Sequence, residues 1–353
     1  MAAVSRCAHN QPPPVSPLDA KKCPPHAFGM TAAENQSFPV RQIVAGILAL
    51  GLFAAVAQAA GAPRGPEFPD ELVHFQPVFP EAIFAGTGQD TWDKRIRERS
   101  YILRDGKTWR MWYNGYNDHQ TPTHFLGYAT SKDGWHWQRA GAEPIYDQGW
   151  IEDVCVVKHA GSYYMFSEGR DDIAHLLQSK DGRHWTERGN LDIRRVDGSP
   201  ITPGPYGTPC AWVEHGVWYL FYERNDAAVS LATSRDLKTW TNIQDEPVLA
   251  CGPEPYDRYA VAFDQVIKYR GRYYAYCHAS ADPKWKDWNT NLAVSTDLVH
   301  WKKYPGNPVL PVDPADPKRS SAFLVPDGKG FRMYATHPDV KVFVSKSAKT
   351  FKK

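Results

Sequence analysis

Over its last three quarters the chain alternates short apolar stretches with turns that contain Gly and Asp, and no useful helical period is present. The stretches are rich in Tyr, Trp and β-branched residues, which favour strands. Three of them, 161–168, 216–223 and 271–278, begin at a Gly and share one register. Segments 109–114 and 331–337 fit this register with a one-residue ambiguity. The pattern predicts an all-β fold.

A serine, an acidic residue two places on and an aromatic residue four places later recur roughly every 50–60 residues. The copies are Ser131-Asp133-Trp137, Ser179-Asp181-Trp185, Ser234-Asp236-Trp240, Ser295-Asp297-Trp301 and the imperfect Ser345-Ser347-Phe351. Such a period in a strand-rich chain is typical of blades around an axis. A turn Asp can accept hydrogen bonds from the amides that follow it. We expect these residues to be structural, with the Trp packed between blades.

These signals together predict a five-bladed β-propeller with four-stranded antiparallel blades, because radial repetition leaves few exposed strand edges. The expected blades are 92–145, 146–200, 201–250, 251–311 and 312–353. The last blade is short, and we expect the extension 61–91 to complete it or to seal the ring.

Residues 1–60 are predicted to be a leader outside the fold. An apolar run, 43–57, follows Arg41 and precedes Ala57-Gln58-Ala59, which is the arrangement of a secretory signal peptide. The run is shorter than the roughly 20 residues that a bilayer requires, although an uncleaved anchor is the alternative. We therefore expect a secreted or periplasmic protein with no membrane contact after signal cleavage.

The bulk composition limits the kinds of partner. The net charge is +2, and the Lys and Arg residues form no cluster of the kind that nucleic acid requires. The four cysteines after the leader, Cys155, Cys210, Cys251 and Cys277, have no C-x-x-C spacing, so we do not expect a zinc site. We expect buried free thiols, disulfides being the alternative that export allows. No cofactor is expected, a structural Ca²⁺ ion without a recognisable motif being the alternative.

In a propeller the first strand of each blade lines the central channel, and the second strand runs antiparallel to it. The start of the first strand and the end of the second therefore share one face. The predicted first-strand positions are Glu98, Asp153, Thr208, Asp264 and Ser320. The predicted second-strand ends are Asn114, Glu168, Glu223, His278 and the Thr336-His337 pair. Like charges brought together cost energy, so this convergence indicates a functional site.

Glycoside hydrolysis requires two carboxyl groups, one to protonate the leaving oxygen and one to attack the anomeric carbon or activate water. A further carboxylate can hold the acid protonated. Trp92, Trp150 and Tyr206 are candidates for stacking on sugar rings, and Thr208 beside Gly207 is expected to leave room for a ligand.

Four segments carry a resemblance to a known group of enzymes: 126–134, 151–157, 161–168 and 307–310. Over about residues 90–353 the chain resembles the five-bladed propeller glycosidases, which include glycoside hydrolase families 43, 32, 68, 117 and 130. The resemblance implies that Asp153 stabilises the transition state or tunes the acid, and that Glu98 is the base or the nucleophile. The general-acid Glu of blade three is absent, because the chain reads Gly207-Thr208-Pro209-Cys210 there. His278, His337 and Glu223 are the candidate substitutes.

The sequence therefore predicts a secreted, exo-acting glycoside hydrolase for an oligosaccharide. The expected catalytic residues are Glu98, Asp153, Glu223 and His278. The expected substrate-binding residues are Arg99, Asn114, Glu168, Asp264, His337 and Trp92. The alternatives are a non-catalytic carbohydrate-binding propeller, a glycoside phosphorylase that holds phosphate on Arg97 and Arg99, and a sialidase-like enzyme.

Overall fold

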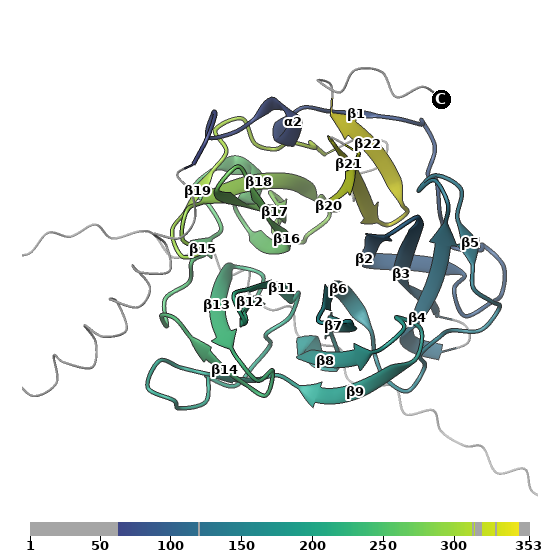
Figure 1. Cartoon of the computed structure of the whole chain (residues 1–353), viewed down its shortest axis with the longest axis horizontal. Coiled ribbons are helices and arrows are strands. Elements are labelled where there is room, and N and C mark those ends of the chain that lie inside the picture. Colours follow the sequence, from purple (N-terminus) through teal and green to yellow (C-terminus); the bar gives the residue numbers. More distant parts are fainter. Residues whose placement is uncertain (1–62, 119–120, 313, 315–319, 329, 346–353) are drawn as a thin grey trace, which may run out of the picture.

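The computed structural model describes residues 63–118, 121–312, 314, 320–328 and 330–345, and the predicted leader lies outside these residues. Five sheets surround a central axis, so the predicted five-bladed β-propeller is confirmed (Figure 1). Blade one contains β2 (Arg95–Asp105), β3 (Thr108–Asn117), β4 (Thr121–Ser131) and β5 (Gln138–Arg139). Blade two contains β6 (Glu152–His159), β7 (Ser162–Glu168), β8 (Ala174–Ser179) and β9 (Trp185–Asn190).

The other three blades keep this order. Blade three contains β11 (Cys210–Glu214), β12 (Val217–Arg224), β13 (Ala228–Ser234) and β14 (Thr239–Asn242). Blade four contains β16 (Ala260–Tyr269), β17 (Arg272–Ser280), β18 (Asn289–Ser295) and β19 (Trp301–Lys303). Blade five contains β20 (Ser320–Asp327), β21 (Gly330–His337) and β22 (Lys341–Ser345). Two short strands extend blade three, because β10 (Asp192–Arg194) pairs parallel with β14 and β15 (Leu249–Ala250) pairs with β13.

The fourth strand of blade five comes from the N-terminal side. Strand β1 (Phe75–Pro77) pairs antiparallel with β22, next to the short helix α2 (Asp70–Val73). Among the inner strands, β2 lies against both β6 and β20, while β16 lies against β11 and β20. The ring is therefore closed by one sheet that contains strands from both ends of the described chain.

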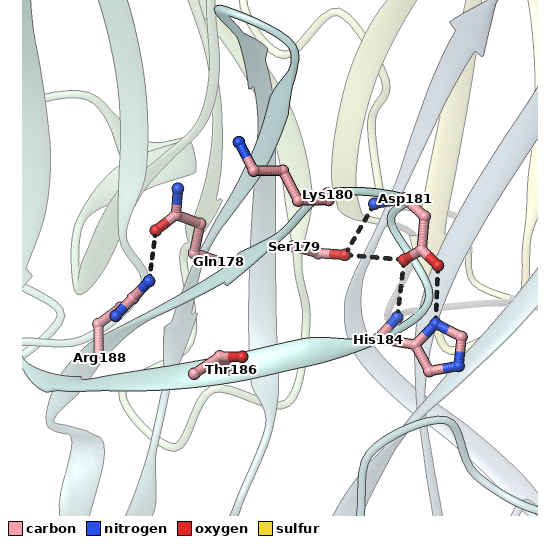
Figure 2. A pocket seen from close by; sticks show the side chains of 7 residues that line it. All are labelled: Gln178, Ser179, Lys180, Asp181, His184, Thr186 and Arg188. Carbon is pink, nitrogen blue, oxygen red and sulfur yellow. Dashed lines mark hydrogen bonds and ion pairs between the residues drawn. The ribbon is translucent and has the colours of Figure 1, made fainter.

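The Ser-x-Asp turns lie at the end of each blade where the second strand begins, as the pairs Trp109–Ser131 and Tyr163–Ser179 illustrate. Figure 2 shows the blade-two copy, in which the Ser179 hydroxyl and the His184 amide both donate to Asp181 Oδ1, at 3.0 and 2.9 Å. The other Asp181 oxygen lies 2.7 Å from His184 Nδ1. One carboxylate thus fixes the whole turn.

In blades two, three and four the Trp of the repeat packs against the preceding blade. Trp185 meets Trp112 edge-on at 6.2 Å between ring centroids, and Trp240 meets Phe166 at 5.7 Å. A hydrogen bond of 2.7 Å from Trp112 Nε1 to the Gly182 carbonyl adds a polar link between blades one and two. The predicted structural role of the turns is confirmed for the copies within the described residues. The fifth copy lies outside them from Ser347 onward.

Three cysteines, Cys155, Cys210 and Cys277, are buried free thiols, as expected. Cys251 is disulfide-bonded, so the expectation of a free thiol is wrong for this residue. In the described part of the chain no helix is long and apolar enough to cross a membrane.

Candidate active site

Four of the five inner strands have a residue in the left-handed backbone conformation close to their start. The residues and their φ angles are Glu98 at 53°, Asp153 at 45°, Thr208 at 43° and Ser321 at 53°. Each costs about 1–2 kcal/mol in a residue other than Gly, and such strain clusters at functional sites. The inner strand is bulged beside Glu98 and Asp153, which interrupts its pairing with the second strand at the face where we expected the site.

Two basic side chains contact the carboxylate of Glu98. The Arg97 guanidinium bonds its Oε1, and His337 Nδ1 lies 3.6 Å from its Oε2. Burial alone would raise the pKa of Glu98, but the charges of His337 and Arg97 outweigh it and lower that pKa to about 2. Glu98 is therefore an ionised carboxylate at any physiological pH.

Asp153 lies on the next blade in the opposite electrostatic state. The backbone amide of Arg99 donates to its Oδ1 at 3.1 Å. Burial raises the pKa of Asp153 to about 7, although Arg99 lowers it, and the negative charge of Glu98 adds to the rise. Neighbouring carboxyl groups of opposite protonation state are the arrangement on which acid–base pairs depend.

Blade three lacks the expected acidic residue at the start of its first strand. Two carboxyl groups from second strands lie there instead, those of Glu168 on β7 and Glu223 on β12. Glu168 Oε2 accepts a hydrogen bond of 2.6 Å from the Thr208 amide, and Glu223 Oε1 accepts one of 3.0 Å from the Gly207 amide. A Cβ atom at Gly207 would lie 2.2 Å from Glu168 Oε2 and 3.0 Å from Glu223 Oε1. The expected room for a ligand beside Thr208 is therefore occupied by these carboxyl groups, and only Gly fits between them.

The pKa values of both carboxyl groups are raised, which favours their protonated forms. Burial, with the nearby charge of Asp153, raises the pKa of Glu168 well above its usual range. Burial and the charge of Asp226 raise the pKa of Glu223 to about 7. Asp226 also donates its backbone amide to Glu223 Oε2, so both oxygens of that carboxyl group are fixed.

His278 completes the face from blade four. Its Nδ1 lies 2.8 Å from Asp264 Oδ1, and its ring meets Trp288 edge-on at 5.2 Å. Burial would lower the pKa of His278, but Asp264 raises it to about 9. The imidazole is therefore positively charged at neutral pH.

Three residues predicted to bind substrate are placed elsewhere. Arg99 is fully buried, and its guanidinium donates to the carbonyls of Asp153, Val154, Pro209 and Phe263. Asp264 is fully buried at a bulge of β16 and supports His278 and Arg99. Trp92 packs on Tyr113 at 5.9 Å, and its Nε1 donates to the Ala142 carbonyl. These three side chains are therefore engaged within the fold, and their direct contact with substrate stays a prediction.

Asn114 lies at the predicted strand end opposite Arg97. It is fully buried, and neither atom of its amide has a hydrogen-bond partner among the described residues. A buried amide of this kind is usually satisfied by an ordered water or a ligand. A substrate-binding role for Asn114 stays a prediction, with which its unpartnered amide is compatible.

Glu152 also lies at this face and was not among the predicted site residues. Its Oε2 accepts from Trp150 Nε1 at 2.7 Å and lies 3.0 Å from His124 Nδ1, while its Oε1 lies 3.5 Å from an Arg97 nitrogen. The consecutive Glu152 and Asp153 at a strand start were the available signal. His124 lies in the third strand β4 and Asp226 in the turn between β12 and β13, and the repeat register marked neither position.

The depression drawn in Figure 2, about 340 Å³, lies beside the blade-two turn and not over these carboxyl groups. Among the described residues no group of three or more His, Cys, Asp or Glu side chains is arranged to hold a metal ion.

Several solved structures share this fold. A glycosyl hydrolase from Bacteroides ovatus aligns with a TM-score of 0.60 and 18% identity over 82% of this chain and 96% of its own. A β-1,2-mannobiose phosphorylase from Listeria innocua aligns with a TM-score of 0.59 and 14% identity over 76% and 95%. A protein from a study of mannoside phosphorylases and glycoside hydrolases of family 130 aligns with a TM-score of 0.59 and 17% identity over 80% and 94%. At these identities the likeness establishes the fold.

The relatives found by sequence comparison have names that indicate no activity. Two uncharacterized proteins of Mycobacterium tuberculosis are 26% and 25% identical over 190 residues, or 48% of this chain. The chain spans 62% of the length of these relatives. No protein-family model matches the chain.

Proposed function

We propose that the protein is a glycoside hydrolase that acts on an oligosaccharide in the central face of the propeller. The observation that carries the proposal is the split in protonation between Glu98, with a pKa of about 2, and Asp153 and Glu223, each with a pKa of about 7. A glycosidase needs one ionised and one protonated carboxyl group at the same pH. The fold shared with known glycosidases supports this proposal.

In the proposed reaction, Glu223 donates its proton to the glycosidic oxygen as the bond from that oxygen to the anomeric carbon breaks. Glu98 either attacks the anomeric carbon or takes a proton from the attacking water. Asp153 and the charged His278 are proposed to stabilise the transition state. Glu168, Asn114 and His337 are proposed to bind sugar hydroxyls, with Arg99 and Asp264 supporting the groups above them.

Glu223 is the proposed substitute for the missing blade-three acid, because its carboxyl group already lies beside Gly207 in that blade. His278 suits the role less well. Its pKa of about 9 makes it a weaker acid than Glu223, and Asp264 holds its Nδ1. A catalytic acid works best when its pKa lies near the operating pH.

The experiment is an activity screen of the full chain on para-nitrophenyl glycosides and matching oligosaccharides. Glu98→Gln and Asp153→Asn should each lower kcat/KM by about 10²–10⁴-fold without unfolding the protein. Glu223→Gln should lose activity on oligosaccharides but retain it on dinitrophenyl glycosides, whose leaving group needs no proton. Full activity in both Glu98→Gln and Asp153→Asn would show that the site assignment is wrong.

Phosphorolysis is the second candidate, because one structure with this fold is a phosphorylase. The expected phosphate ligands suit it poorly, since Arg99 donates to backbone carbonyls and Arg97 is paired with Glu98 and Glu152. Turnover that requires inorganic phosphate and releases a sugar phosphate would favour this candidate over hydrolysis.

Secretion is also a proposal, and the signal-peptide pattern within residues 1–60 is its support. We propose a secreted or periplasmic protein that needs no cofactor, and activity that survives chelation by EDTA would support the latter point.

A further inference from the structure

The loop 281–288 joins β17 to β18 immediately after His278, on the same face as the proposed site. Trp285 lies in this loop with 46% of its surface exposed. Among the described residues, only Trp285 and Val196 are large hydrophobic side chains with such exposure. An exposed Trp costs apolar contact with water, so a ligand that covers it would be favoured.

Hydrogen bonds hold the loop in one shape. The Ser280 hydroxyl donates to Asp287 Oδ1 at 3.0 Å and accepts from the Asp282 amide at 3.1 Å. The Asp282 carboxylate in turn accepts from the Lys284 amide at 2.7 Å, and its carbonyl accepts from the Trp285 amide at 3.0 Å. These hydrogen bonds therefore fix the backbone that carries the exposed indole of Trp285.

The backbone at Trp285 is strained, because its φ angle is 52°. A bulky residue in this region is unusual, because its Cβ atom crowds the following carbonyl oxygen. A Gly would adopt the conformation without this crowding. The loop thus keeps a large aromatic side chain, turned to solvent, at a position where it destabilises the fold.

Trp288 connects this loop to the site. It is half-buried and meets the His278 ring edge-on, with 5.2 Å between centroids and an interplanar angle of 82°. Two tryptophans three residues apart therefore lie on one loop, one against a site residue and the other exposed.

We propose that Trp285 and Trp288 form a stacking subsite for a pyranose ring of the substrate, separate from the ring that is cleaved. The proposal rests on the proposed carbohydrate activity and adds that the substrate has at least two rings. The C–H face of a pyranose is apolar and covers an indole well, while its hydroxyls stay in water. Stacking of a base on an aromatic side chain strengthens nucleic-acid binding on the order of ten- to a hundredfold, which gives the scale for a sugar ring.

The test compares Trp285→Ala, Trp285→Phe and the wild type on two probes. The one-ring probes are para-nitrophenyl glycosides of mannose, glucose, galactose, xylose and arabinose, and the longer probes are the matching di- to tetrasaccharides. Trp285→Ala should raise KM for the longer probes about tenfold, with kcat within twofold and the one-ring probes unaffected. Trp285→Phe should recover most of the affinity. Val196→Ala removes the other exposed apolar side chain and should change neither parameter.

Equal KM values for Trp285→Ala and the wild type on the longer probes would overturn the subsite and leave the proposed function standing. An equal loss on the one-ring probes would also overturn it, because the effect would then come from the cleavage site. A wild-type protein that cleaves no member of the panel would overturn the proposed function, and the subsite with it.

Discussion

The two ends of the blades hold carboxyl groups in opposite states. At the turn end, hydrogen bonds from the His184 and Arg183 amides and the His184 ring lower the pKa of Asp181 well below its usual range. At the channel end, burial raises the pKa of Asp153 and Glu223 to about 7. The turn carboxylate of Asp181 is exposed and accepts several donors, whereas Asp153 and Glu223 are buried beside like charges. Glu98 is the exception at the channel end, because Arg97 and His337 keep it ionised.

Each repeat therefore has two roles, a structural role at its turn end and a chemical role at its channel end. A carboxylate with ample donors stabilises the ionised form and fixes the chain locally. A buried carboxyl group that is short of positive charge stores a proton near neutral pH, at some expense of stability. The turn end therefore determines the fold, and the channel end is free to vary for chemistry.

The largest expected effect comes from exchanging a carboxyl group for an amide at each end. Glu223→Gln should lower kcat/KM on oligosaccharides by about 10²–10⁴-fold with little change in thermal stability. Asp181→Asn should leave kcat/KM unchanged and lower the stability. Steady-state kinetics and thermal unfolding of both variants check this, and equal activity in the two would contradict the division between the ends.

Gly207→Ala should be the next largest, because its Cβ would collide with Glu168 Oε2 at 2.2 Å. A displacement of catalytic groups by about 1 Å can cost 10²-fold in rate, so we expect a loss of that order. Gly141→Ala is the matched control, since a Cβ at Gly141 meets no atom within 4 Å. Similar kinetics for the two variants would mean that the carboxyl groups beside Gly207 have no role in the reaction.

The pH profile should show a smaller effect. Glu98 is ionised above about pH 2, and the proton on Glu223 is lost through a pKa of about 7. Activity should therefore fall about tenfold per pH unit above pH 7, with no acidic limb in the range where the protein is folded. Measurements of kcat/KM from pH 4 to 9 check this, and a rate that rises through pH 7 would exclude Glu223 as the acid.

The smallest effect is on stability at the turns. Asp181→Ala removes acceptors for two backbone amides, which should cost about 1–2 kcal/mol, the scale of a lost helix cap. Because the folded-state pKa of Asp181 is depressed, its contribution is present above the unfolded value near 3.9 and is lost as the pH falls below it. Urea denaturation should show the gap at pH 7 and a narrower gap at pH 3.

The fold could be predicted because its signal is local. The Ser-x-Asp turn forms its hydrogen bonds within a few residues, so each copy is readable in the sequence. The parallel pairing of β10 with β14 joins segments that no short pattern relates, and residues 192–194 were accordingly placed in blade two.

The site could be predicted only as far as strand register allows. The strand ends at Glu168, Glu223 and His278 follow from the alternation of each hairpin. The bulge that buries Asp264 and the opposite environments of Arg97 and Arg99 depend on packing across the ring. The packing of Trp92 could not be predicted for the same reason, because a Trp near a site and a Trp in the core have the same sequence signal.

The closure of blade five has a consequence for the order of folding. Phe75 pairs with Ser345, so the last sheet cannot form until both segments are available. Pairing over so long a stretch of chain is entropically slow. We expect blades one to four to assemble on their own and the ring to lock in a final step, with a mispaired β22 edge as the main route to aggregation.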